Sequence, residues 1–422
     1  TISAAWIEAV YRTYLQPALI PRNSLFSWSS DTVADIRSRN PHLHNISFLL
    51  PIHSHRPYLI VSTSLLGPTS ISPYSLHTHN FTRIEHTPLY TGQMKTVDMQ
   101  YTHYDRVLRK KRGTQQTVGG VLEPFAVVGA LNIPSPSHGL ESNTTSSVLE
   151  VPFPSLTNSC GSTCVPIQSL ERVVSASSFA PGTLISMLPS PLADKIEMQA
   201  SYWSPASEHP IERLNLVGDG GSTENIPLIS FLQRQVSHII LIVNTITPLQ
   251  PAHKWDVRHD QSADGQIDVD LSAFFGIIPS KLNIEDRLTT DLSKNQVFSR
   301  DIWPDFVLQL QAAQAEGRGI VITKNMTTVE NIWWGIPRGL NTRLTVMYMG
   351  RVHQWEDRLP AALKPLLVPA ERRDDLSHCV TDGPFKDFPH FPTTGGSLNY
   401  EKANIIANLM GWVIEQQIHQ FV

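Results

Sequence analysis

The sequence has little cysteine and no long hydrophobic run, and both shortages exclude classes of protein. Three cysteines among 422 residues are too few for a disulfide scaffold. No stretch approaches the roughly 18 apolar residues that a membrane span needs, and the first residues lack the basic and then apolar pattern of a signal peptide. Localisation stays open between secreted and cytoplasmic, because the four Asn-x-Ser/Thr sequons are about what chance supplies.

Charge is also sparse. Charged residues make up 17% of the chain and the formal net charge is -4, so the balance does not favour a nucleic-acid binder held by phosphate contacts. The sharpest basic cluster, residues 106–112 (RVLRKKR), predicts a solvated loop, with a lipid-phosphate patch as the alternative. We expect no metal site, because the acidic stretch 264–270 has its glycine and glutamate misplaced for a calcium loop. Four histidines are spaced as on a strand rather than as metal ligands: His42, His44, His53 and His55.

Strand-like and helix-like patterns alternate along the chain. Apolar runs within residues 45–67 predict buried strands, and a polar region follows at 86–113. Residues 304–317 predict a helix, and residues 400–421 predict an amphipathic one. No repeat or clean linker divides these elements, which predicts one α/β domain over residues 1–422. Within it, residues 134–169 are rich in Ser, Pro, Thr and Asn and predict a surface loop or lid.

The most informative stretch is residues 214–245, LNLVGDGGSTENIPLISFLQRQVSHIILIVNT. A short apolar strand ends at Asp219, and the pair Gly220-Gly221 permits a tight turn with positive φ. A helix with Pro227 in its first turn and a second buried strand follow. The pattern predicts a βαβ unit with Asp219 at the carboxyl end of its first strand, where open α/β sheets bind ligands. Asp-Gly is also common in plain turns, so the residues alone leave a structural role open.

This stretch resembles the catalytic-aspartate block of the patatin-like and cytosolic phospholipase A2/phospholipase B lipid hydrolases. In those families an Asp-Gly-Gly follows a strand, and an Asn-x-Pro element comes a few residues later. The matching residues are Asp219-Gly220-Gly221 and Asn225-Ile226-Pro227. Residues 175–182 (SASSFAPG) and 84–92 (IEHTPLYTG) resemble two further segments of these enzymes. The resemblance is close over the aspartate block and loose elsewhere.

The resemblance implies a mixed central sheet flanked by helices and a Ser-Asp dyad that hydrolyses phospholipid or lysophospholipid esters. A serine on a Gly-x-Ser-x-Gly turn attacks the ester, and the aspartate, here Asp219, is the base. Gly220, Gly221 and Asn225 are the residues expected to contact the substrate. The family's chemistry needs no cofactor and no metal, and a lipid substrate leaves contact with a membrane surface open.

The sequence departs from the family pattern at the nucleophile. Neither a Gly-x-Ser-x-Gly nor a glycine triplet for an oxyanion loop occurs in the 422 residues. The chain opens on TISAAWIEAVY, which has helical spacing without a residue to cap it and is similar to the helix after the nucleophile turn in these enzymes. We therefore expect a longer gene product, cut by proteolysis, and a heterodimer in which a small N-terminal companion chain carries the serine.

Other origins for the nucleophile stay open. Thr1 could act as an exposed N-terminal nucleophile with its own amine as base. Ser3 could stand in a degenerate nucleophile turn, although Thr1 is bulky where that turn needs glycine. A function of another class stays open too: a catalytically inactive relative that binds lipid or a partner, such as a storage or defence protein.

Overall fold

The computed structural model describes residues 2–39, 43–51, 58–71, 81–105, 110–122, 169–180, 198–207, 213–280, 291–368, 376–392 and 398–422. The predicted α/β class is confirmed, because these residues form several sheets and helices. The chain divides into two compact units, unit 1 (Thr1–Asn225 and Ile284–Asp291) and unit 2 (Ile226–Asn283 and Leu292–Val422). The single domain over residues 1–422 stays a prediction. Apart from Ser169, the predicted loop at 134–169 lies outside the described residues.

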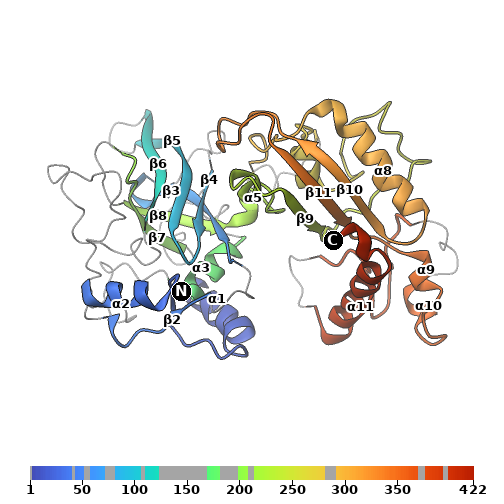
Figure 1. Cartoon of the computed structure of the whole chain (residues 1–422), viewed down its shortest axis with the longest axis horizontal. Helices are drawn as coiled ribbons and strands as arrows, with labels where there is room; N and C mark the ends of the chain where they lie inside the picture. The colour runs from blue at the N-terminus through green and yellow to red at the C-terminus, as the bar shows by residue number, and fades with distance from the viewer. Residues whose placement is uncertain are drawn as a thin grey trace. The chain divides into compact units, whose positions relative to one another are not determined.

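Unit 1 is built around a six-stranded sheet in the order β6-β5-β4-β3-β8-β7, in which every neighbouring pair is antiparallel (Figure 1). Its strands are β3 (Val61–Pro68), β4 (Thr82–His86), β5 (Thr91–Asp105), β6 (Lys110–Leu122), β7 (Met198–Tyr202) and β8 (Arg213–Asp219). A separate parallel pair joins β1 (Leu25–Phe26) to β2 (Phe48–Leu49). The strands predicted within residues 45–67 are therefore confirmed as β2 and β3.

In the described parts of unit 1, three α-helices accompany the sheet. They are α1 (Ile2–Val10), which a π-helical turn at Tyr11–Leu15 extends, α2 (Ser30–Arg39) and α3 (Leu170–Ser177). The helix α1 packs on α3, because the indole N–H of Trp6 donates to the carbonyl of Ser175 at 3.0 Å. In turn, α3 packs against β3 and β8. The helix predicted from TISAAWIEAVY is confirmed, whereas Thr1 lies outside the described residues.

Unit 2 contains a mixed sheet in the order β10-β11-β9. Its strands are β9 (His238–Val243), β10 (Ile320–Thr327) and β11 (Asn341–Tyr348), with β10 antiparallel and β9 parallel to β11. The helices are α5 (Ile229–Gln233), α6 (Val269–Ala273), α8 (Trp303–Ala315), α9 (His353–Glu356), α10 (Lys364–Leu367) and α11 (Tyr400–Gln416). The helices predicted at 304–317 and 400–421 are confirmed as α8 and α11.

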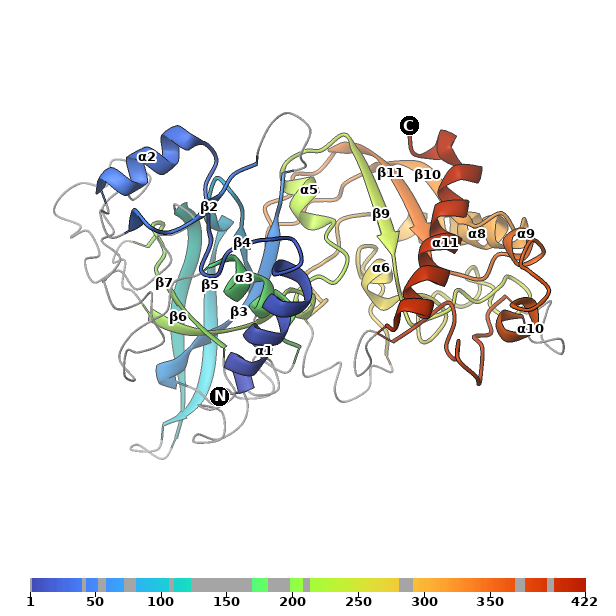
Figure 2. The same ribbon diagram turned by 90° about the horizontal axis from the view of Figure 1, so that it is seen from below.

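Helices cover both faces of this small sheet (Figure 2). On one face, residues such as Leu344 and Val346 share a core with Phe306 of α8. On the other, Met347 shares a second core with Leu409 of α11. A mixed sheet flanked by helices is thus present, as three strands in unit 2.

The predicted βαβ unit at 214–245 is wrong in its pairing, although its three elements are present. The strands β8 and β9 belong to different sheets: β8 pairs antiparallel with β3 and β7, and β9 pairs in parallel with β11. The rule that places ligands at the carboxyl ends of parallel strands therefore does not apply to Asp219. The strand β9 also buries only one face, since Ile240 and Ile242 are exposed.

Candidate functional site

Asp219 is the last residue of β8, and its side chain begins the short 3-10 turn η6 (Gly220–Ser222). Its Oδ1 accepts a hydrogen bond from the backbone N–H of Gly221 at 2.8 Å. Its backbone carbonyl accepts a second bond, from the hydroxyl of Ser64 on β3, at 2.6 Å. The end of the strand is therefore fixed through both the main chain and the side chain of Asp219.

The turn after Asp219 is closed by the carbonyl oxygen of Gly220. That oxygen lies 3.1 Å from the backbone nitrogens of both Thr223 and Glu224, and 3.0 Å from the hydroxyl of Thr223. All three groups donate to it, so the backbone folds back on itself at once. Of the predicted substrate residues, Gly220 and Gly221 lie in this turn and Asn225 follows it directly.

The expectation that the glycine pair adopts positive φ is wrong, because neither Gly220 nor Gly221 does so. Close approach is the reason for glycine here. A Cβ added to Gly220 would lie 2.5 Å from the backbone oxygen of Ser62 on β3, closer than real Cβ atoms come. A Cβ added to Gly221 would lie 3.0 Å from Oδ1 of Asn225. The turn is therefore pressed against β3 on one side and against Asn225 on the other.

The surroundings of Asp219 alter its acidity. Partial burial raises the pKa of Asp219 above its ordinary value, and the hydrogen bond from Gly221 opposes that rise. Burial disfavours the charged carboxylate, so a proton is held more tightly than on an exposed aspartate. A carboxylate of this kind is a better general base near neutral pH than an unperturbed one.

A buried histidine and a threonine share the face of the sheet that carries the Asp219 side chain. Thr63 on β3 is the register partner of Asp219, and its hydroxyl lies 3.1 Å from Nε2 of His86 on β4. Burial lowers the pKa of His86 to about 4, so the imidazole is neutral at physiological pH. Sequence reasoning missed both residues: His86 stands inside the IEHTPLYTG segment, but nothing local assigns it a place near Asp219.

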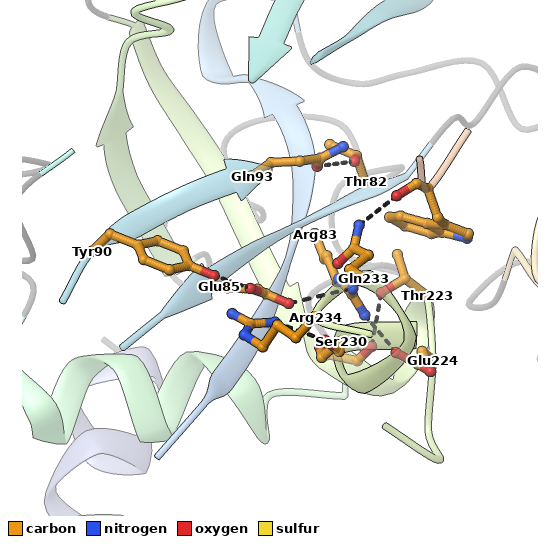
Figure 3. Close-up of polar contacts among 12 residues, drawn as sticks. Thr82, Arg83, Glu85, Tyr90, Gln93, Thr223, Glu224, Ser230, Gln233 and Arg234 are labelled. Atoms are coloured by element: carbon orange, nitrogen blue, oxygen red, sulfur yellow. Dashed lines mark hydrogen bonds and ion pairs between the residues drawn. The ribbon is translucent and has the colours of Figure 1, made fainter. Parts of the chain in front are cut away.

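A cluster of buried charges lies on the opposite side of β4. Nη1 of Arg83 lies 2.5 Å from Oε2 of Glu224, and Nη2 lies 3.3 Å from Oε1 of Glu85. The hydroxyl of Tyr90 donates to the other oxygen of Glu85 at 2.6 Å (Figure 3). Arg83, Glu85 and Glu224 are 2%, 1% and 8% exposed. Removing one partner of such a buried pair costs about 3–5 kcal/mol, because the other charge is left uncompensated.

The remaining residues that the sequence offered as candidates lie in ordinary structural positions or outside the described residues. Ser3 lies within the first turn of α1, a helical position rather than the strand-to-helix turn of a nucleophile. Asp268, in the acidic stretch 264–270, caps α6 by accepting from the N–H groups of Asp270 and Leu271. His42, His53 and His55 lie outside the described residues.

In the described parts of the chain, no three His, Cys, Asp or Glu side chains lie close enough together to bind a metal ion. No helix in those parts has the length and apolar character needed to span a membrane.

Comparisons with known protein families, with curated proteins and with solved structures gave no match to this chain.

Proposed function

We propose that the chain is the larger part of a serine acyl-ester hydrolase that acts on phospholipids or lysophospholipids, with Asp219 as the base of a Ser-Asp dyad. One observation carries the proposal: Asp219 ends β8 with its carboxylate oriented by the N–H of Gly221 and its pKa raised by burial. A fold of the patatin and phospholipase A2/B type belongs to the same proposal. The resemblance of the Asp-Gly-Gly block supports both.

In this mechanism the base takes the proton of a serine hydroxyl while the serine oxygen attacks the ester carbonyl. Oδ1 of Asp219 already accepts the bond from Gly221, so Oδ2 is the oxygen proposed to accept the proton. Gly220, Gly221 and Asn225 are proposed to line the substrate side of the turn. No Gly-x-Ser-x-Gly occurs in these 422 residues, so the serine is proposed to lie on a small N-terminal companion chain.

Replacing the proposed base tests the function. In protein expressed from the complete coding sequence, Asp219→Asn should lower kcat for lysophospholipid hydrolysis by about 10²–10⁴-fold, the usual contribution of a positioned base. Asp268→Asn is a matched control, because Asp268 also caps a short helix through backbone N–H groups and burial also raises its pKa. The control should keep its turnover. Unchanged turnover in Asp219→Asn would remove Asp219 from the mechanism.

The inactive, lipid- or partner-binding relative stays as the second candidate because the 422 residues contain no nucleophile turn. Mass measurement under denaturing conditions separates the two. The hydrolase proposal expects a small peptide with a Gly-x-Ser-x-Gly to copurify. The absence of both that peptide and ester hydrolysis would favour the inactive relative.

A further inference from the structure

Arg83 connects the middle of the unit 1 sheet to the turn that follows Asp219. Along the register, Arg83 on β4 pairs with Ser64 on β3, and Ser64 pairs with Gly218 on β8. Side chains of register partners lie on the same face, and Gly218 has none. From this row Arg83 reaches Glu224, with Nη1 2.5 Å from Oε2.

The residue that Arg83 holds is part of the turn. The backbone N–H of Glu224 donates to the carbonyl of Gly220 at 3.1 Å. The next residue after Gly220 supplies the N–H that orients the Asp219 carboxylate. A displacement of Glu224 therefore loosens the bond that closes the turn, and with it the position of the Gly221 N–H.

The second carboxylate of the cluster has another role. Glu85 lies on the same strand as Arg83, and the hydroxyl of Tyr90, from the connection between β4 and β5, donates to it. The contact between Arg83 and Glu85 thus stays within neighbouring parts of one hairpin (Figure 3). The contact with Glu85 holds the guanidinium of Arg83 in place. The contact with Glu224 joins that guanidinium to the turn.

A buried ion pair is weak evidence for a contribution to stability, because desolvation cancels much of the attraction. Its use as an oriented support for a neighbouring functional group is physically better founded, since such groups need partners that are themselves held rigidly. Arg83 meets that requirement: it is buried and it contacts both Glu85 and Glu224.

We propose that Arg83 is a positioning residue, which through Glu224 fixes the turn that orients the Asp219 carboxylate. The effect of Arg83 on catalysis rests on the proposed function. Arg83 acts through another residue and is not assigned any contact with the substrate.

The matched pair Glu224→Gln and Glu85→Gln tests this proposal in protein from the complete coding sequence. Each variant removes one carboxylate charge from the same guanidinium at constant side-chain shape, but only Glu224 belongs to the turn. Glu224→Gln should speed hydrogen exchange at the Gly221 and Glu224 amides and lower kcat by about 10–100-fold at constant KM, as a misplaced catalytic group does. Glu85→Gln leaves the pair between Arg83 and Glu224 in place, so it should change both the exchange rates and kcat much less than Glu224→Gln does, even if its melting temperature falls as far.

A conservative replacement of Arg83 should preserve part of the activity that a neutral replacement loses. Arg83→Lys keeps a charge that can face Glu224 and should retain more of kcat than Arg83→Met. Equal exchange at the turn amides in both glutamine variants, or faster exchange in Glu224→Gln at unchanged kcat, would overturn the proposal. If the unmodified protein hydrolyses no ester, the proposed function fails on its own, and the exchange comparison still decides whether Arg83 holds the turn.

Discussion

At the scale of single residues, Asp219 lies where partial burial disfavours the ionised form of its carboxylate. Burial raises its pKa, and the N–H of Gly221 compensates only in part. Sequence reasoning placed Asp219 correctly at the end of a strand, because an apolar run followed by Asp-Gly is a local signal. It could not find Arg83, which contacts the turn across 141 residues of sequence, because nothing in a local pattern specifies which strands become neighbours.

The raised pKa of Asp219 predicts that the ionised carboxylate lowers the stability of the fold at neutral pH. Ionisation of an aspartate whose pKa is raised by folding destabilises the folded state, because unfolding returns the charge to water. This destabilisation is absent below the ordinary Asp pKa of about 3.9 and grows as the pH rises through the folded-state pKa. At neutral pH, Asp219→Asn should therefore unfold at a higher urea concentration than the unmodified protein. At a pH well below the ordinary Asp pKa, the two proteins should unfold at the same urea concentration. A less stable Asn variant at neutral pH would contradict this.

The close approach of Gly220 to β3 predicts that a larger side chain at this position destabilises the fold. Gly220→Ala would place a Cβ 2.5 Å from the Ser62 oxygen, and overpacking of this kind typically costs about 1–3 kcal/mol. Gly113→Ala on β6 is the control, because an added Cβ there has no atom within 4 Å. Chemical denaturation should show a loss for the first variant and none for the second. Equal stabilities would mean that the turn can move away from β3.

At the scale of elements, the sequence predicted which helices and strands exist better than it predicted which strands pair with one another. The helices α8 and α11 were recovered because their apolar residues recur at helical spacing. The hairpin of β5 and β6 was missed within a polar region, although Val97, Met99 and Tyr101 are buried and alternate with exposed Asp98 and Gln100. Its two-residue period is a strand signal that the overall polarity of the segment obscured.

The strand β9 was predicted to be fully buried because its six residues are nearly all apolar. Its pattern is instead that of an edge strand, whose inner residues Ile239, Leu241 and Val243 are in the core. A continuous apolar run cannot distinguish these two cases, since the exposed face carries isoleucine as well.

This difference between the faces of β9 predicts two unequal truncations. Ile239→Ala removes a side chain that is 3% exposed and should cost about 2–5 kcal/mol of unfolding free energy. Ile242→Ala removes one that is 55% exposed and should cost about 1 kcal/mol or less. Urea unfolding measures both. A large loss at Ile242 would show that another segment covers this face in solution.

At the scale of the whole molecule, four hydrophobic core clusters of the described residues each lie within one of the two units. Among the described residues, two core clusters consist only of residues from Ile226 onward, and the small clusters around Leu25 and Leu15 lie wholly in unit 1. Cores that do not cross a boundary are typical of parts that can fold separately. The sequence could not locate this boundary, because no change in composition marks it.

A fragment of residues 226–422 is therefore expected to fold by itself. It contains the two core clusters described from Ile226 onward and the mixed sheet β10-β11-β9. Circular dichroism should show a cooperative thermal transition for this fragment. A fragment that stays unfolded, or that melts without cooperativity, would mean that unit 2 depends on unit 1 for its stability.

We propose that Asp219 activates a serine that lies outside these 422 residues. The most direct measurement is the rate at which a fluorophosphonate labels the protein from the complete coding sequence, with the modified residue located by mass spectrometry. We expect one labelled serine within a Gly-x-Ser-x-Gly of the companion chain, and a labelling rate that falls sharply in Asp219→Asn but not in Asp268→Asn. Labelling within residues 1–422, no labelling at all, or an equal rate in Asp219→Asn would contradict it.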